Sequence, residues 1–326
     1  MTLGKSQFKR QWTLLSERPL FVGQRTTIKT LPRRVFLRLL DCESAQRLAV
    51  EGGMLYDKRR SIYKALNHPV TRPALAVAAT ITKSVMCREP CLVWYKGGQW
   101  IHRHPNGYLV ERQIMLHSIA DFHATNTDYF LHSYRLRPGD VAIDGGACTG
   151  WETLLFSQLV GPSGRVVAIE AHPVTYKCLT EMCRRNQLAN VVPLNCAVAE
   201  KAGTATITDF DEQQQANTIA GDRGVTPVKL RTIDDIVSEL GIKRVDLVKL
   251  NIEGSELNAL CGARETLPIT QHLAVACHDF LADEFGENMR TKAKVRSLLE
   301  NAGFRITERP DDPRPWIRDS IYADRS

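Results

Sequence analysis

The first residues that could bind a ligand or do chemistry follow an apolar segment in the middle of the chain. Residues 141–143 are Val-Ala-Ile, and they lead into Asp144 and the glycine-rich string at residues 145–150. Glycine has no side chain, so backbone amides can approach a ligand closely. Doubly wound α/β sheets bind nucleotide-like ligands at a turn of this kind between a strand and a helix. The expected cofactor contacts are Asp144, Gly145, Gly146, Ala147 and Gly150.

Acidic residues near this loop favour a cationic adenosyl ligand over a dinucleotide. Ala147 stands where the dinucleotide pattern Gly-x-Gly-x-x-Gly requires its second glycine. Asp144 would repel a pyrophosphate, but it suits a ligand that carries an ammonium and a sulfonium. Glu170 follows Gly150 by about 20 residues, the separation at which a carboxylate accepts both ribose hydroxyls. We therefore predict S-adenosylmethionine as the cofactor. In the alternative, both carboxylates only cap the helices that follow them.

Further cofactor contacts are expected where the second and third strands end. Ala171 follows Glu170 directly, and Asn195, Cys196 and Ala197 close the third strand. At these positions side chains or backbone could flank an adenine ring, as could Trp151 at the start of the first helix. Each of them is equally suited to packing.

Two later strand ends carry groups that can deprotonate a hydroxyl. Asn251 and Glu253 follow the fourth strand, and His278 and Asp279 follow the fifth. Methyl transfer is a displacement that needs an aligned nucleophile, and a hydroxyl must also lose its proton. We predict that His278, neutral near pH 7, is the general base and that Glu253 orients it or the substrate. In the alternative, Glu253, His278 and Asp279 hold a divalent metal. Purely structural roles, such as a helix-terminal charge at Glu253, also stay open.

These positions require strands whose ends meet at one edge of a sheet. From about residue 137, strand-like and helix-like segments alternate, which is typical of βαβ units. The fold class predicted is α/β, with a Rossmann-like, mostly parallel, doubly wound sheet. The expected strands are residues 141–144, 165–170, 191–196, 246–250 and 273–277, with extended pieces at 204–208 and 228–232 and final strands near Phe304 and Ile321. The expected helices are residues 151–160, 174–187, 255–266 and 287–301.

The first part of the chain has a different texture. Apolar residues recur at helical spacing in residues 35–48 and 75–86, whereas residues 91–111 contain three short β runs separated by Gly-Gly and Asn-Gly. We predict a helical region and a β-meander over residues 1–125, as a substrate-recognition extension of a methyltransferase domain at residues 126–326.

Aromatic and imidazole side chains gather in the predicted meander. They either form a shelf for a sugar ring or pack the hairpins onto the domain. The candidates are Tyr95, Trp100, His102, His104 and Tyr108.

Composition excludes several classes of protein. The net charge of the 326 residues is +7, a mild excess spread over short clusters, so no nucleic-acid partner is expected. The longest apolar run, residues 74–86, is broken by polar residues and is shorter than the roughly 20 residues that cross a bilayer. No export signal is apparent. A cytoplasmic protein with a small-molecule or glycan acceptor is therefore expected.

The nine cysteines fit a reducing compartment better than a disulfide framework. Three residues lie between Cys87 and Cys91, and four lie between Cys178 and Cys183. Neither pair therefore has the two intervening residues of a structural zinc site. We predict ordinary thiols and no metal.

Six strings in fixed order make the chain resemble the FkbM family of S-adenosylmethionine-dependent methyltransferases. The resemblance spans roughly residues 137–307, over half of the chain. The strings are Pro-Gly-Asp at 138–140, Ile-Asp-Gly-Gly-Ala-Cys-Thr-Gly at 143–150, Ala-Ile-Glu-Ala-His-Pro at 168–173, Asn-Cys-Ala-Val at 195–198, Thr-Ile-Asp-Asp at 232–235 and Val-Lys-Leu-Asn-Ile-Glu-Gly at 248–254. The resemblance implies a class I methyltransferase fold and O-methylation of a saccharide, glycolipid or secondary-metabolite hydroxyl.

Two departures from the family pattern concern residues near the predicted site. Family members often carry aspartate in the position of Asn251 and a small polar residue in that of Cys148. Asn251 keeps open a non-catalytic, Rossmann-like binding protein as an alternative. A nicotinamide-dependent oxidoreductase is a second alternative, although Asp144 disfavours it.

Overall fold

The computed structural model describes residues 66–207, 226–282 and 286–325. Contacts divide the chain into two units, Met1–Leu75 and Ala76–Ser326, and the description below concerns the second. The helix predicted at residues 35–48 lies outside the described residues. The one predicted at residues 75–86 falls within α5 (Arg72–Cys87). Among the described residues, no helix is both long enough and apolar enough to cross a membrane.

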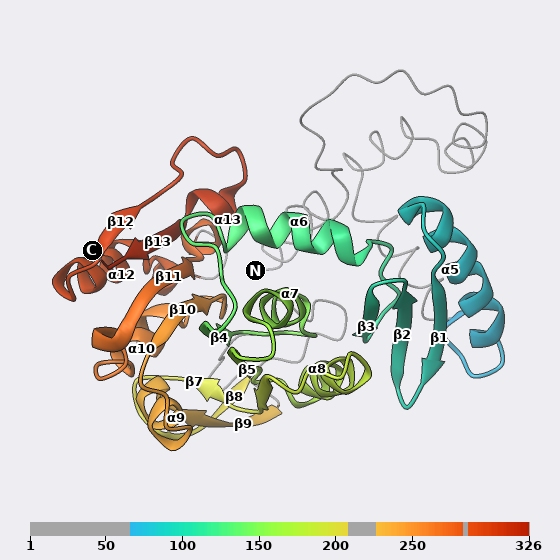
Figure 1. The fold of residues 1–326 in the computed structure, drawn as a ribbon, viewed down its shortest axis with the longest axis horizontal. Helices are drawn as coiled ribbons and strands as arrows, with labels where there is room; N and C mark the ends of the chain where they lie inside the picture. The colour runs from blue at the N-terminus through green and yellow to red at the C-terminus, as the bar shows by residue number, and fades with distance from the viewer. Residues whose placement is uncertain (1–65, 208–225, 283–285, 326) are drawn as a thin grey trace. The chain divides into compact units, whose positions relative to one another are not determined.

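A seven-stranded sheet forms the centre of the second unit, with strand order β12-β13-β11-β10-β4-β5-β6 (Figure 1). Neighbouring strands in this sheet run parallel except β13, which is antiparallel to both β11 and β12. This topology confirms the predicted α/β, mostly parallel, doubly wound sheet. The strands are β4 (Val141–Gly145), β5 (Arg165–Ile169), β6 (Val191–Leu194), β10 (Val245–Leu250), β11 (Thr270–Ala276), β12 (Arg305–Thr307) and β13 (Ser320–Asp324).

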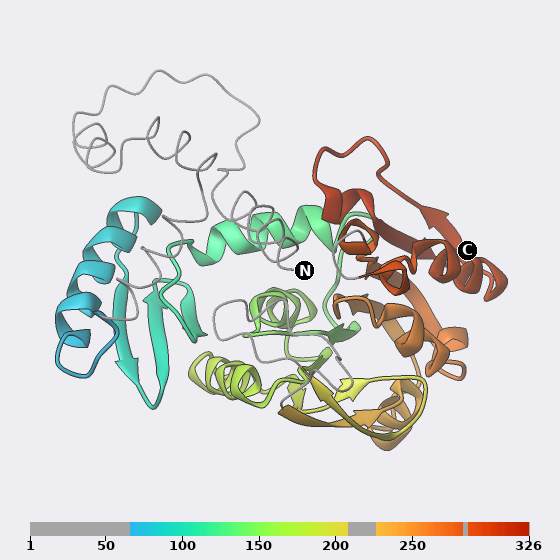
Figure 2. The same ribbon diagram turned by 180° about the vertical axis from the view of Figure 1, so that it is seen from behind.

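Helices cover both faces of this sheet, as the views from the front and from behind show (Figures 1 and 2). Side chains alternate along each strand, so Ala142 and Ile143 enter two different cores. The core of Ala142 contains α7 and α8, and the core of Ile143 contains α9, α10 and α12. Burial on both faces explains why these strands are almost continuously apolar. The helices are α7 (Trp151–Val160), α8 (Pro173–Arg185), α9 (Ile233–Glu239), α10 (Glu256–Cys261) and α12 (Lys292–Asn301).

Two helices are shorter than predicted. The segment predicted at residues 255–266 is helical only to Cys261. The next residue, Gly262, approaches the backbone of Ala199 so closely that a Cβ there would lie 2.2 Å from the Ala199 carbonyl oxygen. The segment predicted from residue 287 begins as a 3-10 turn, η5 (Glu287–Met289), before α12. Further short helices are η3 (Leu267–Ile269), η4 (Asp279–Leu281) and α13 (Pro315–Arg318).

Helix α6 (Ile119–Tyr129) was not predicted. Its local signal is a capping box, in which Ser118 and Asp121 each accept a hydrogen bond from the other's backbone amide. The helix packs beside α7 (Figure 1).

The meander predicted at residues 91–111 is confirmed as an antiparallel sheet of β1 (Leu92–Lys96), β2 (Gln99–His104) and β3 (Gly107–Glu111). Asn186, at the end of α8, holds this sheet: its side chain accepts from Tyr108 N and donates to Tyr108 O, both at 2.8 Å. Side chains of β2 and β3 share one core with α7 and α8. The division at residues 125 and 126 remains a prediction.

The structure favours the packing alternative for the meander side chains over the aromatic shelf, because three of the five candidates are buried. Trp100 and His102 are 0% exposed and His104 is 3% exposed. Tyr95 packs edge-on against Trp100 at a centroid distance of 5.2 Å. Trp100, His102 and His104 therefore pack the meander and present no surface to a sugar, whereas Tyr95 and Tyr108 are half-buried.

A second small sheet has the order β7-β9-β8 and contains β7 (Ala197–Val198), β8 (Gly203–Ile207) and β9 (Thr226–Arg231). The strand predicted at residues 191–196 therefore ends at Leu194, and the chain changes sheet at residues 195–196.

Candidate active site

The carboxyl ends of β4, β5, β10 and β11 meet at one edge of the central sheet. From β4 the chain continues to β5 and β6 on one side, and β10 and β11 lie on the other. The loops after β4 and β10 therefore diverge, and this switch point is where open α/β sheets bind ligands. Most of the predicted site residues lie on the loops at this edge.

The loop after β4 is a tight turn against both neighbouring strands. The amides of Gly146 and Ala147 donate to Ile169 O at 3.0 and 2.9 Å. Gly146 has φ 76° and Gly150 has φ 101°, conformations that favour glycine. A Cβ on Gly146 would lie 2.0 Å from Asn251 O, at the end of β10. The glycine therefore lets the cofactor loop contact the loop that carries the catalytic candidates.

We expect Gly146→Ala to destabilise the protein by about 2–6 kcal/mol, the sum of backbone strain and overpacking, and to abolish S-adenosylmethionine binding. Thermal unfolding and calorimetry measure the two effects. Gly203→Ala is the matched control, because nothing lies within 4 Å of a Cβ at that position. Normal stability and cofactor binding in Gly146→Ala would show that this close approach is not needed.

Asp144, at the end of β4, is fully buried and paired inside the chain. Its Oδ1 accepts from Lys249 Nζ at 2.9 Å and its Oδ2 from Thr153 Oγ1 at 2.6 Å. The same ammonium donates to Gly146 O at 2.9 Å. The sequence analysis placed this carboxylate against the cationic ligand and missed Lys249. The structure adds that Lys249 links Asp144 to Gly146 of the glycine loop; the contact of Asp144 with the cofactor stays a prediction.

Glu170 follows β5 and is 9% exposed. Its carboxylate accepts the amides of Cys148 at 2.9 Å and His172 at 2.8 Å, so it joins the first two loops. Burial raises its pKa to about 7, and these two hydrogen bonds only partly offset that rise. Two accepted bonds leave lone pairs on both oxygens for further donors.

The other predicted cofactor contacts lie at the same edge. The Asn195 side chain donates to Glu170 O at 2.8 Å and Ala171 O at 3.0 Å, and so fixes the loop after β5. Cys196 and Ala197 are buried at the change from β6 to β7. Trp151 stacks on Phe122 of α6, with ring centroids 3.9 Å apart.

Glu111, the last residue of β3, is a further candidate that the sequence analysis missed. It is 0% exposed, and its Oε1 accepts from Thr149 Oγ1 at 3.0 Å and from Trp151 Nε1 at 2.5 Å. Its Oε2 is buried without a hydrogen-bond partner. Burial raises its pKa to about 7. No sequence motif marks this residue; only packing of the meander brings it to the glycine loop.

His278 lies between two carboxylates. Its Nδ1 is 2.9 Å from Glu256 Oε1 and its Nε2 is 3.4 Å from Glu253 Oε1. Glu256 Oε1 also accepts the amides of Ile252 and Gly254 at 3.1 and 3.2 Å, which fixes the loop after β10. Glu253 has φ 52°, an uncommon conformation for a residue other than glycine.

The structure corrects the predicted protonation state of His278. Burial alone lowers the pKa of this ring, but the charges of Glu253 and Glu256 outweigh burial and raise it well above 6.5. The imidazole is therefore charged near pH 7, and it donates from both nitrogens. A charged ring cannot accept a proton, so the group able to act as base in this cluster is a carboxylate.

Two other candidates have different surroundings. Asp279 turns to the start of α12, where its Oδ1 accepts the amides of Thr291 and Lys292 at 2.9 and 3.0 Å. It therefore does not join Glu253 and His278 in the alternative metal set. Asn251 is half-buried, and its backbone N–H donates to Gly145 O at 3.0 Å.

This edge has the features that an S-adenosylmethionine site needs. The glycine loop admits backbone contacts, Glu170 can accept hydroxyl hydrogen bonds, and Glu111 offers a buried oxygen with an open lone pair. Carboxylates at both positions suit a ligand with an ammonium and a sulfonium.

The chain is similar in sequence to known proteins. The family model described as "Methyltransferase FkbM domain" matches residues 144–306, half of the chain. The chain is 27% identical over 248 residues to the 31-O-demethyl-FK506 methyltransferase FkbM of Streptomyces tacrolimicus, covering 64% of this chain and 90% of the relative. It is 25% identical over 229 residues to Methyltransferase sdnD of Sordaria araneosa, covering 60% and 84%. The crystal structure of Methyltransferase FkbM from Methylobacillus flagellatus KT aligns with a TM-score of 0.43 and 21% identity, over 59% of this chain and only 45% of that one.

Proposed function

Because the chain belongs to the FkbM methyltransferase family, we propose that it methylates a hydroxyl of a small-molecule acceptor: a saccharide, a glycolipid or a secondary metabolite. Family membership makes it an S-adenosylmethionine-dependent methyltransferase; the hydroxyl and the acceptor class are the proposed part. The observation that carries the proposal is the Glu253–His278–Glu256 cluster at the ends of β10 and β11. A hydroxyl must lose a proton to be methylated, and a carboxylate beside the transferred group supplies the base.

The name of one relative supports transfer to oxygen. The Streptomyces tacrolimicus protein is a 31-O-demethyl-FK506 methyltransferase, and this chain covers 90% of its length. At 27% identity the relative supports the type of reaction. It does not identify the acceptor of this chain.

The residues of the cluster have distinct roles in the proposed reaction. S-adenosylmethionine, when bound, supplies an electrophilic methyl group. Glu253 Oε1 takes the proton from the acceptor hydroxyl. The charged His278 ring stabilises the Glu253 carboxylate at 3.4 Å and is itself positioned by Glu256 at 2.9 Å. In this assignment His278 orients the base, which reverses the roles predicted from sequence.

The cofactor-binding residues are proposed from their places around the glycine loop. Glu170 accepts ribose hydroxyls, and the backbone of the loop, Gly145 to Gly150, approaches the rest of the ligand. Glu111 pairs with the ammonium group of the cofactor. The residues before residue 126 include β3, which ends at this site, and we propose that this region also selects the acceptor.

Incubation of the purified chain with S-adenosylmethionine and a panel of hydroxylated saccharides, glycolipids and secondary metabolites tests the proposal. The expected result is a product heavier by one methyl group, with the matching deoxy compound inert. Methylation of amines or carbon acceptors alone would show that transfer to oxygen is wrong. Calorimetry with NAD tests the oxidoreductase alternative, and binding of neither ligand would favour a non-catalytic protein.

We expect affinity for S-adenosylmethionine to rise between about pH 6 and pH 8. The pKa of Glu170 is about 7, raised from its ordinary 4.5 mainly by burial, so the group is mostly protonated below pH 7 and charged above it. Only the charged form accepts from both hydroxyls without donating. Calorimetry across this range should show the rise in the wild type and in Glu200→Gln, an exposed control. The rise should be smaller in Glu170→Gln, where Glu111, whose pKa is also about 7, still titrates. A rise of unchanged size in Glu170→Gln would assign it to a group other than Glu170.

A further inference from the structure

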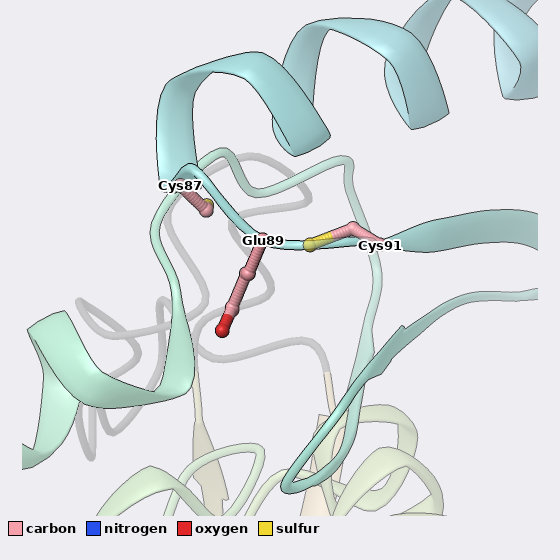
Figure 3. A group of neighbouring side chains, drawn as sticks. All are labelled: Cys87, Glu89 and Cys91. Atoms are coloured by element: carbon pink, nitrogen blue, oxygen red, sulfur yellow. The ribbon is translucent and has the colours of Figure 1, made fainter.

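Outside the active site, a second group of chemistry-bearing side chains lies where α5 meets β1 (Figure 3). Cys87 ends the helix, Glu89 lies on the connecting loop and Cys91 immediately precedes the strand. One ligand atom from each of these three residues can be chosen so that all lie within 4.8 Å of one another. The sequence spacing alone disfavoured a metal site, but the turn after α5 brings both sulfurs and the carboxylate within 4.8 Å of one another.

His104, at the end of β2, brings a further ligand atom beside two members of this group, Glu89 and Cys91. Its Nδ1 is 2.7 Å from Glu89 Oε1 and 3.4 Å from Cys91 Sγ. In a tetrahedral zinc site, Zn–N and Zn–S distances near 2.0 and 2.3 Å place nitrogen and sulfur ligands about 3.6 Å apart. The observed separation is already close to that value. Burial lowers the pKa of His104, which keeps its ring in the neutral form that binds metals.

We propose that Cys87, Glu89, Cys91 and His104 bind one zinc ion. Two sulfurs, one imidazole nitrogen and one carboxylate oxygen form a closed tetrahedral set, which is typical of a structural site. On binding, each thiol loses its proton to solvent, and the sulfur lone pairs bind the ion. The ion links the end of α5 to β1 and β2, and thereby fixes the meander whose last residue, Glu111, reaches the cofactor loop.

The charge around the group also favours a dication. Two thiolates and the Glu89 carboxylate carry three negative charges, so the site with a bound zinc ion keeps one net negative charge. The ammonium of Lys83, which is buried beside His102 at 3.1 Å, interacts with both cysteines and with Glu89 and can balance that charge. Without an ion, burial raises the pKa of Cys87 to about 12, so both sulfurs are then held as thiols.

Metal analysis of the full chain, purified under reducing conditions, tests the proposal. We expect about one zinc per chain, and about one after dialysis against zinc and then buffer. Cobalt loaded in place of zinc should give sulfur-to-metal charge-transfer absorption. Cys87→Ser should lose the metal and this absorption, whereas Cys261→Ser, a half-buried cysteine elsewhere, should keep both.

Glu89→Gln keeps the test decisive if Cys87→Ser does not fold, because the Glu89 side chain is 25% exposed and tolerates the change. It should weaken zinc affinity at least about tenfold, measured against a competing chelator. The proposal would be overturned if the reduced wild type failed to bind zinc or cobalt, or if these variants bound the metal equally well. A Cys87–Cys91 disulfide found by mass in the protein purified under reducing conditions would also overturn it. None of these readouts depends on methyltransferase activity.

Discussion

Glu253→Gln is expected to lower kcat for methyl transfer by about 10²–10⁴-fold, the usual contribution of a positioned proton acceptor. An amide keeps the size and shape of the side chain, but it does not accept the hydroxyl proton. The substitution also removes one of two charges that raise the pKa of His278. Because Glu253 is proposed to act on the acceptor, affinity for S-adenosylmethionine should change little.

Single-turnover rates and calorimetry separate these effects. Glu300→Gln, an exposed substitution on α12, serves as the matched control and should leave both quantities unchanged. Since the pKa of His278 lies well above 6.5, wild-type kcat should show no transition near pH 6.5 from this ring. Unchanged kcat in Glu253→Gln would exclude this carboxylate as the base. A transition near pH 6.5 that disappears in His278→Gln would restore the histidine as base.

Lys249→Met is expected to destabilise the protein by about 3–5 kcal/mol, because it leaves the Asp144 carboxylate buried without its partner. Both side chains are 0% exposed and lie 2.9 Å apart. Burial lowers the pKa of Lys249, but the charges of Asp144 and Glu152 outweigh burial and keep it raised, so the ammonium is charged. Denaturant unfolding measures the loss, and Lys243→Met, on an exposed loop, is the control.

The double variant Asp144→Asn with Lys249→Met distinguishes the pair from simple packing. Removing both charges should restore part of the stability lost in Lys249→Met, because no unpaired charge then remains buried. If the two single losses simply add, the ion pair does not explain the effect. Cofactor affinity in the double variant shows separately whether Asp144 also contributes to the ligand.

Strong local patterns explain why much of the fold was predictable. Residues 141–145 and 245–250 are apolar on both faces because helices cover the sheet on both sides, and such runs identify central strands directly. Gly-Gly and Asn-Gly at the two turns of the meander, and the glycine loop after β4, mark their own positions. By contrast, α6 was missed because its hydrophobic periodicity is weak and its signal is confined to the cap at Ser118.

The residues at strand ends were predicted, but several of their partners were not. The end of a strand can be recognised from the residues next to it in the sequence, so Glu170, Glu253 and His278 could be placed at the edge of the sheet from sequence alone. Protonation depends on which charges the fold brings near. Glu256 is the first residue of α10, three positions after Glu253, and its carboxylate contributes to making His278 a cation rather than a neutral base.

The sequence by itself determined the class of fold and the family, and it marked the glycine-rich loop that is proposed to bind the cofactor. Each of these is encoded by contiguous strings of residues. Only the tertiary structure decided that Asp144 pairs with Lys249, that Glu111 reaches the glycine loop and that His104 lies beside Cys91, near Cys87 and Glu89 of the same turn. The Cys91–His104 contact is 3.4 Å, and ligand atoms of Cys87, Glu89 and Cys91 lie within 4.8 Å of one another. These contacts join segments from different elements. Their energies depend on burial and distance, which spacing along the chain does not specify.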